Sequence, residues 1–527
     1  MSQRTKISTA TVSMAVATTC SRMAGLVRDV VIARLFGAGF ATDAFFMAFT
    51  IPNLLRRFFG EGSLTAAFVP TFTEIYQQQG EVEAQRLANR CVTLLLLVMF
   101  FVVTAGILAS PWIVSGIGYG FAEVQGKLDL TDTLNRLMFP YIGLVSLLAL
   151  LTGVLNVHGH FFLPSLSPLL LNVSMIVSAL TLGQLFEQPI VALAVGVIAG
   201  GLVQLLLQYP ALLKYRIKFH LDWSFRNDPA LRRIVLLMLP GIAGVAIYQI
   251  NVVVTRLMAS FLPEGSVSYL YYGQRLFEFP QGIFIVSLAQ AALPAMSRQA
   301  ADKDWDGLQE SLRFSLALIA IFTLPAIIGL ILCAEPVFSL FFMGGEFDLT
   351  ALENTALTLV CYAPGLFFVG MSRIAAQTFY ALKDTRTPVR ISFWTLLVNA
   401  GCGFLLMFPL RHFGLAIALT LASAFNAGLL LYFLRRKVGP FLQGALVSPV
   451  LRSLPGCLVM GLTVYLVLGI VDWQKEGEVF WKSSVLAGAV GLGLVSYLMT
   501  CLVLRVEQIR QGWGLLKARR KKSLNEV

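Results

Sequence analysis

Long apolar runs separated by short polar segments recur along the whole chain. Most runs are about 20 residues long, the length that a helix needs to cross the hydrocarbon core of a bilayer. Windows of that length predict about fourteen spanning helices and therefore an all-α polytopic membrane protein. The predicted spans lie at 8–36, 40–59, 91–114, 137–156, 161–186, 188–213, 234–262, 266–297, 314–341, 354–382, 391–410, 412–434, 448–471 and 483–504.

The composition agrees with this pattern. Hydrophobic residues make up 57% of the 527 positions and charged residues 13%, far outside the range of soluble domains. The first apolar run is long and contains Arg22 and Arg28, so we interpret it as a retained span rather than a cleaved signal peptide. The net charge of +12 comes from short basic clusters between apolar runs, so we expect no nucleic-acid partner.

The basic clusters occupy alternate loops. One set of loops holds most of the lysines and arginines, including Arg435 to Lys437 and the tail from Arg505 to Lys522. The opposite set is richer in acidic residues, and Lys127 is one of its few bases. Because basic loops stay on the cytoplasmic side, the even number of spans predicts that both termini are cytoplasmic.

A weak internal similarity relates the first two spans to the seventh and eighth. The motif FGAG-x-x-x-DAFF beginning at Phe36 is echoed by PEG-x-x-x-YLYY beginning at Pro263. An offset of six spans preserves orientation and predicts two parallel six-helix lobes, although glycine and proline can also recur by chance. We expect lobes at 1–220 and 221–440, two further helices at 441–505, and a basic cytoplasmic tail at 506–527.

Charged residues inside the predicted spans are the main candidates for function. Each costs roughly 2.5–3.5 kcal/mol at a helix centre unless it faces a partner or water. In the first two spans and at their ends these residues are Arg22, Arg28, Asp29, Arg34, Asp43, Arg56, Arg57 and Glu61. Arg34, Arg56, Arg57 and Glu61 lie near predicted span ends, where extension of the side chain to the interface is an equal alternative.

Helical spacing suggests how these charges combine. Arg22 and Asp29 share a face, and an Asp29–Arg22 or Arg28–Asp43 ion pair is the purely structural alternative. In the eighth span, Arg275 and Glu278 are spaced to pair with each other, with Gln274 alongside. Pro280 follows directly, and a proline-broken helix beside charged groups is a common arrangement for a binding site at the membrane midplane.

The remaining polar residues predict no chemistry on a substrate. The cysteines are scattered, the histidines lack metal-site spacing, and no phosphate-binding loop or nucleophile elbow occurs, so we expect no enzyme activity, metal or cofactor. Single residues such as Asn172 are interpreted as links between helices, with Arg256 and Arg373 worth testing. The excess of arginine predicts an anionic headgroup, because planar guanidinium groups match phosphate.

The run from Ser21 to Pro70 closely resembles the signature of the MurJ (MviN) family, the lipid II flippases of bacterial peptidoglycan synthesis. Ser266 to Phe284, Ala381 to Pro388 and Gly414 to Leu431 extend the resemblance, whereas Thr50 and Gln274 depart from some relatives. The resemblance implies the fold of multidrug/oligosaccharidyl-lipid/polysaccharide exporters in the bacterial inner membrane. That fold has two six-helix lobes around a central cavity and two final helices that form a groove for a polyprenyl tail.

The same resemblance implies a substrate and a site. The substrate would be lipid II, an undecaprenyl-pyrophosphate-linked disaccharide-peptide, moved by alternating access among membrane lipids, with coupling to ions or membrane potential left open. The alternatives are a flippase for another polyprenyl-linked glycan, a cation-coupled multidrug antiporter and a non-transporting scaffold for cell-wall enzymes. The implied substrate-binding and transport residues are Arg22, Arg28, Asp43 and Arg275, supported by Asp29, Arg57 and Glu278.

Overall fold

The computed structural model of the chain describes residues 3–59, 63–215, 217, 219–441, 444–475 and 477–510. Within these ranges the named elements are all helices, which confirms the predicted all-α class. The chain divides into two compact units, Met1–Ser268 and Tyr269–Val527. The predicted lobes, which rest on a count of spans, remain a prediction.

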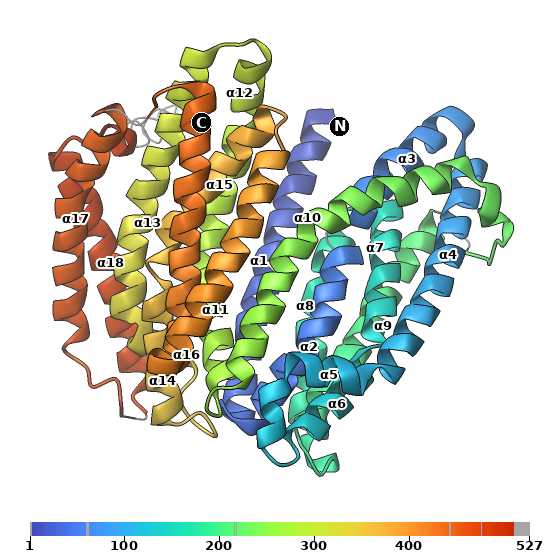
Figure 1. Cartoon of the computed structure of the whole chain (residues 1–527), viewed down its shortest axis with the longest axis horizontal. Coiled ribbons are helices and arrows are strands. Elements are labelled where there is room, and N and C mark those ends of the chain that lie inside the picture. Colours follow the sequence, from blue (N-terminus) through green and yellow to red (C-terminus); the bar gives the residue numbers. More distant parts are fainter. Residues whose placement is uncertain are drawn as a thin grey trace, which may run out of the picture. The chain divides into compact units, whose positions relative to one another are not determined.

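The first unit is a bundle of long helices joined by short turns (Figure 1). Its elements are α1 (Gln3–Phe36), α2 (Phe40–Phe59), α3 (Ser63–Gln79), α4 (Glu81–Leu108), α5 (Ser110–Ile117), η1 (Tyr119–Glu123), α6 (Lys127–Met138), α7 (Tyr141–Val157), α8 (Phe162–Leu182), η2 (Gly183–Leu185), α9 (Val191–Lys214), η3 (Ser224–Asn227) and α10 (Pro229–Ser260).

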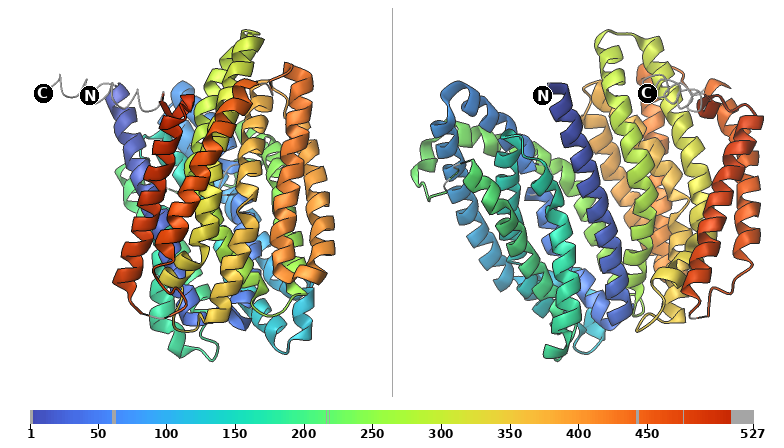
Figure 2. Two further views of the ribbon diagram at one scale, coloured as in Figure 1. Left: turned by 90° about the vertical axis from the view of Figure 1, so that its left-hand side faces the viewer. Right: turned by 180° about the vertical axis from the view of Figure 1, so that it is seen from behind.

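The second unit has the same character, and α11 (Ser266–Pro280) begins at the division between the units. Its further elements are the π-helical η4 (Gln281–Val286), α12 (Ser287–Ala301), α13 (Trp305–Phe341), α14 (Leu349–Tyr362), α15 (Gly365–Ala381), α16 (Arg386–Val438), α17 (Gly444–Leu468) and α18 (Val479–Val503). In both views of Figure 2 the red helices α17 and α18 run side by side.

Each predicted span overlaps a helix of the structure. Within the described residues, nine helices are long and apolar enough to cross a membrane, or ten if the bent pair α14 and α15 is one span. The chain is therefore a multi-pass membrane protein. The count of about fourteen spans remains a prediction.

Helix α3 lies outside the predicted spans, between the second and the third. Its carboxyl-terminal half is polar, with Glu74 and three consecutive glutamines, so the apolar run is shorter than a membrane span requires. It nevertheless buries Phe68 and Phe72 in a core shared with α4, α7 and α9. An amphipathic helix of this kind gains its stability from tertiary packing rather than from length.

Aspartates cap the amino-terminal ends of several helices, where their side chains accept hydrogen bonds from backbone N–H groups that would otherwise be unpaired. Asp228 accepts hydrogen bonds from Ala230 and Leu231 at the start of α10. Asp304 and Asp348 do the same at the starts of α13 and α14. These caps set where the helices begin after polar loops.

Three helix breaks coincide with features visible in the sequence. Backbone dihedrals of φ 51° and ψ −135° at Arg411 divide α16 into two helical halves, as the predicted spans at 391–410 and 412–434 require. A bend of 40° separates α14 from α15, at the turn that contains Pro364. The π-helical segment η4 directly follows Pro280, consistent with the predicted irregularity there.

Small residues allow close contact between α8 and α9. A Cβ atom at Gly196 would lie 2.8 Å from the Cα atom of Met175, and one at Gly200 would lie 3.0 Å from the Cα atom of Leu171. Glycines spaced four residues apart therefore let the two backbones touch, which is a common way to pack helices in a membrane.

Candidate transport site

Arg28 is buried in a network that joins α1 to α8. Its guanidinium Nη2 lies 2.6 Å from Asp29 Oδ1, and its Nη1 donates to Asn172 Oδ1 at 2.9 Å. The amide of Asn172 in turn donates to the backbone carbonyl of Ser21 at 3.2 Å. Asp29 therefore pairs with its neighbour Arg28, and Asn172 links helices as predicted.

Asp43 lies in a second buried network, at the start of α2. Its carboxylate accepts hydrogen bonds from Lys127 Nζ at 2.9 Å, Gly265 N at 2.8 Å, and the backbone N–H and hydroxyl of Ser268 at 2.9 and 2.7 Å. The side chains of Lys127 and Asp43 are only 2% and 1% exposed. Asp43 thus pairs with Lys127 of α6, and not with Arg28 as one structural alternative supposed.

Lys127 is the site residue that sequence reasoning missed. The alternation of basic loops places it in a loop on the outer side, between the predicted spans at 91–114 and 137–156. Besides its ion pair, its ammonium lies 4.4 Å from the centroid of the Phe121 ring. The available signal was its isolation, since it is one of few bases in an otherwise acidic set of loops.

The other predicted residues of the first two helices are more accessible. Arg22 and Arg34 are exposed on α1, and Arg57 is partly buried with its guanidinium 5.6 Å from the centroid of the Tyr248 ring. Arg56 donates to Asn53 Oδ1 at 3.1 Å. Glu61 lies outside the described residues.

In the second unit, α11 presents a partly exposed arginine. Arg275 Nη1 lies 3.4 Å from Glu278 Oε2, and its Nη2 donates to the Tyr271 hydroxyl at 3.2 Å. The predicted pair of Arg275 and Glu278 is therefore present, with Gln274 donating to the same Glu278 carboxylate at 3.3 Å. The side chains of Arg275 and Glu278 are 38% and 37% exposed, so the guanidinium remains accessible to a ligand.

The two further arginines differ in environment. Arg256 donates to the backbone carbonyl of Val267 at 3.0 Å and so joins α10 to the start of α11. Arg373 is exposed on α15. Within the described residues, no group of three or more His, Cys, Asp and Glu side chains is arranged to hold a metal ion.

Several arginines lie in or beside apolar helices, some buried with partners and some accessible. Intramembrane charges of this kind are typical of transporters, so the fold and the site define a polytopic membrane transport protein. Comparison with known proteins gives the family. The model of the family described as lipid II flippase MurJ matches residues 32–483. The chain belongs to the lipid II flippase MurJ family.

Relatives match over nearly the whole chain. It is 35% identical over 505 residues to a probable lipid II flippase MurJ of Vibrio cholerae, covering 93% of this chain and 94% of the relative. It is 34% identical over 423 residues to the lipid II flippase MurJ of Burkholderia cenocepacia, covering 80% and 82%.

Solved structures agree on the fold. The inward closed conformation of lipid II flippase MurJ superposes with a TM-score of 0.78 at 25% identity, covering 94% of this chain and 100% of that one. An inward-facing multidrug resistance MATE transporter of the MOP superfamily gives a TM-score of 0.67 at 14% identity, covering 80% and 95%. The second likeness concerns the fold alone.

Proposed function

We propose that this chain translocates lipid II from the cytoplasmic to the outer face of the bacterial inner membrane. Membership of the lipid II flippase family supports this proposal. The observation that carries the site assignment is the accessible guanidinium of Arg275, held on α11 beside Tyr271 and Glu278. A planar, permanently charged donor of this kind suits a pyrophosphate.

In this proposal the predicted transport residues have two roles. Arg275, which is partly exposed, and Arg22, which is exposed, contact the anionic headgroup, and Arg57 and Glu278 adjust the local charge. Arg28, Asp29 and Asp43 are buried among protein partners and act as positioning residues that hold α1, α2 and α11 in place. The substrate is moved by alternating access and leaves chemically unchanged, and both termini lie in the cytoplasm.

Reconstituted protein tests the proposal. The full chain is inserted into vesicles that contain lipid II, and the appearance of lipid II on the opposite face is measured with a headgroup-specific probe. We expect the wild type to move lipid II, and Arg275→Ala to move it at least about tenfold more slowly, because a charge-assisted hydrogen bond contributes about 1.5–3 kcal/mol.

Arg86→Ala is a suitable control, because Arg86 is an exposed arginine paired with Glu83 at the start of α4. It should transport at the wild-type rate. Equal rates for Arg275→Ala and wild type would contradict the site assignment. Transport of a different polyprenyl-linked glycan or of an organic cation, without lipid II, would contradict the proposed substrate.

A further inference from the structure

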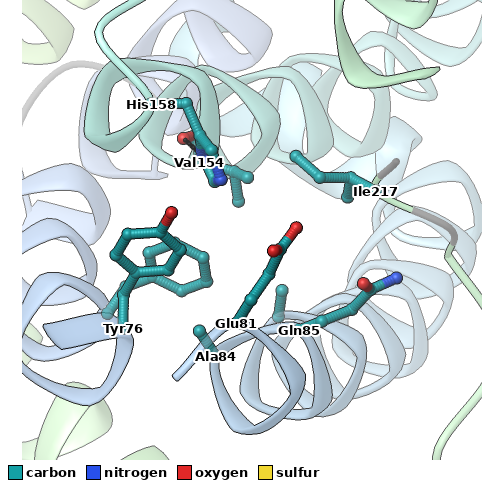
Figure 3. Close-up of a pocket in the computed structure, with 9 residues that line it drawn as sticks. Tyr76, Glu81, Ala84, Gln85, Val154, His158 and Ile217 are labelled. Atoms are coloured by element: carbon teal, nitrogen blue, oxygen red, sulfur yellow. Dashed lines mark hydrogen bonds between the residues drawn. The ribbon is translucent and has the colours of Figure 1, made fainter. Parts of the chain in front are cut away.

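A small cavity in the first unit lies where several helices end (Figure 3). Tyr76 is in the last turn of α3, Glu81 begins α4, His158 caps α7, and Ile217 follows α9. Because α4, α7 and α9 belong to candidate membrane spans, these ends mark the level at which the spans reach one membrane surface. The cavity is therefore positioned at the membrane–water interface, away from the charged networks described above.

Acceptor groups on three side chains line the cavity, those of Tyr76, Glu81 and His158, beside the amide of Gln85, which both donates and accepts. His158 Nδ1 lies 2.9 Å from the carbonyl oxygen of Val154, which can only accept, so Nδ1 carries a proton and, in the neutral imidazole, Nε2 is the acceptor. In Figure 3 the Tyr76 hydroxyl points toward His158, and the Glu81 carboxylate points into the cavity between Val154 and Ile217. A ligand that fits these groups donates hydrogen bonds.

Electrostatics at the cavity favour a cation. Three helices, α3, α7 and α9, bring their carboxyl ends to it, and each such end carries partial negative charge. The one amino-terminal end, that of α4, already has Glu81 in its first turn. Two aromatic rings, those of Phe72 and Tyr76, also line the cavity, and the His158 ring packs against Tyr76 with the ring centroids 5.3 Å apart.

The size of the cavity limits the ligand. Its volume is about 10 Å³, which is room for one water-sized group. An ammonium group of the form –NH3+ is of this size and donates three hydrogen bonds, whereas a trimethylammonium group is larger and donates none. We propose that this cavity binds a primary ammonium group, of the kind carried by an ethanolamine phospholipid headgroup or by a soluble amine.

Lipid binding to the purified full chain tests this site. Phosphatidylethanolamine and phosphatidylcholine with identical acyl chains are titrated separately, and bound lipid is counted by native mass spectrometry. We expect at least about tenfold tighter binding of the ethanolamine lipid, consistent with one charge-assisted hydrogen bond. Soluble ethanolamine and choline form a second pair of titrations that distinguishes a lipid source from a soluble one.

Two variants make the test specific. Glu81→Gln keeps the shape of the side chain and removes its charge, so it should abolish the preference for ethanolamine. Glu83→Gln is the control: Glu83 shares the first turn of α4 but pairs with Arg86 and does not line the cavity, so the preference should persist.

Thermal unfolding of each variant checks that it is folded. Glu81-dependent preference for either ethanolamine compound over its choline counterpart supports the site, and the compound that shows it identifies the source. Equal binding of ethanolamine and choline compounds, or a preference that persists in folded Glu81→Gln, would overturn the proposal.

Discussion

At the scale of single residues, buried charges in this protein are satisfied by specific partners. The Asp43 carboxylate accepts one hydrogen bond from Lys127 and three from the segment Gly265–Ser268. Removing one member of such a pair leaves the other as an uncompensated buried charge, which typically costs about 3–5 kcal/mol. Asp43 is therefore first a structural residue, and loss of function on its substitution does not by itself show contact with substrate.

Asp43→Asn should lower the unfolding free energy by about 3 kcal/mol or more, because it leaves the Lys127 ammonium unpaired. The double variant Asp43→Asn, Lys127→Met should recover part of that loss. Thermal unfolding of the purified protein in detergent measures both. The control is Asp129→Asn, which removes an exposed carboxylate from the same helix as Lys127. Equal melting temperatures for Asp43→Asn and Asp129→Asn would contradict the assigned ion pair.

Sequence reasoning located these charged residues but not their partners. Arg28, Asp29 and Asp43 stood out because charge within an apolar run is costly. Helical periodicity then suggested partners on the same or the next helix, whereas Asp43 pairs with a lysine 84 residues away. The isolation of Lys127 in the sequence marks it as unusual but does not name its partner, because the contact arises only when α2 and α6 pack together in the fold.

At the scale of elements, close glycine contacts join the helices of the first unit. Gly196→Ala would place a methyl group against the backbone of α8, and such overpacking typically costs about 1–3 kcal/mol. Gly401→Ala, in a position on α16 with open space, should be neutral or stabilise its helix by up to about 1 kcal/mol. The melting temperature of Gly196→Ala should therefore be lower than that of wild type, and that of Gly401→Ala should be equal or higher. A Gly196→Ala variant as stable as Gly401→Ala would contradict the close approach of α8 and α9.

A polar contact between the α15–α16 turn and the end of α16 should depend on pH. Burial alone would raise the pKa of Asp384, but hydrogen bonds from Lys437 and Thr387 outweigh it and lower the pKa to about 2. Since the folded pKa lies below the usual value of 3.8, the contact stabilises the protein above about pH 4 and is lost as the pH falls toward 2.

The difference in melting temperature between wild type and Asp384→Asn should consequently be constant from pH 8 to about pH 5 and shrink at lower pH. High salt should reduce it as well, because the Lys437 side chain is 48% exposed. A difference that grows as the pH falls from 5 to 3 would have the wrong sign for this ion pair.

The predicted spans anticipated the elements well, because runs of about 20 apolar residues leave few alternatives to a helix. The predicted break between the spans at 391–410 and 412–434 falls at Arg411, the residue whose backbone is non-helical. Helix α3 was not assigned as a span, since its stability depends on burial of Phe68 and Phe72 against other helices. Packing of that kind leaves only a weak periodic trace in the sequence.

At the scale of the whole molecule, the distribution of basic loops predicts the orientation in the membrane. In a background carrying Cys20→Ser, which removes an exposed native thiol, Lys475→Cys should react with a membrane-impermeant maleimide in cells with a permeabilised outer envelope. Asp302→Cys should react only after the inner membrane is opened. Both positions are exposed. Labelling in the opposite order would contradict the predicted cytoplasmic termini.

The central claim, that this chain moves lipid II and uses Arg275 to hold its headgroup, is tested most directly in cells. The protein is depleted, replaced by wild type or Arg275→Ala at matched abundance, and lipid II on the outer face of the inner membrane is measured. We predict that wild type restores external lipid II, whereas depletion alone or Arg275→Ala leaves it inside. Normal external lipid II and growth with Arg275→Ala would contradict the role of Arg275, and normal external lipid II after depletion would contradict the proposed function.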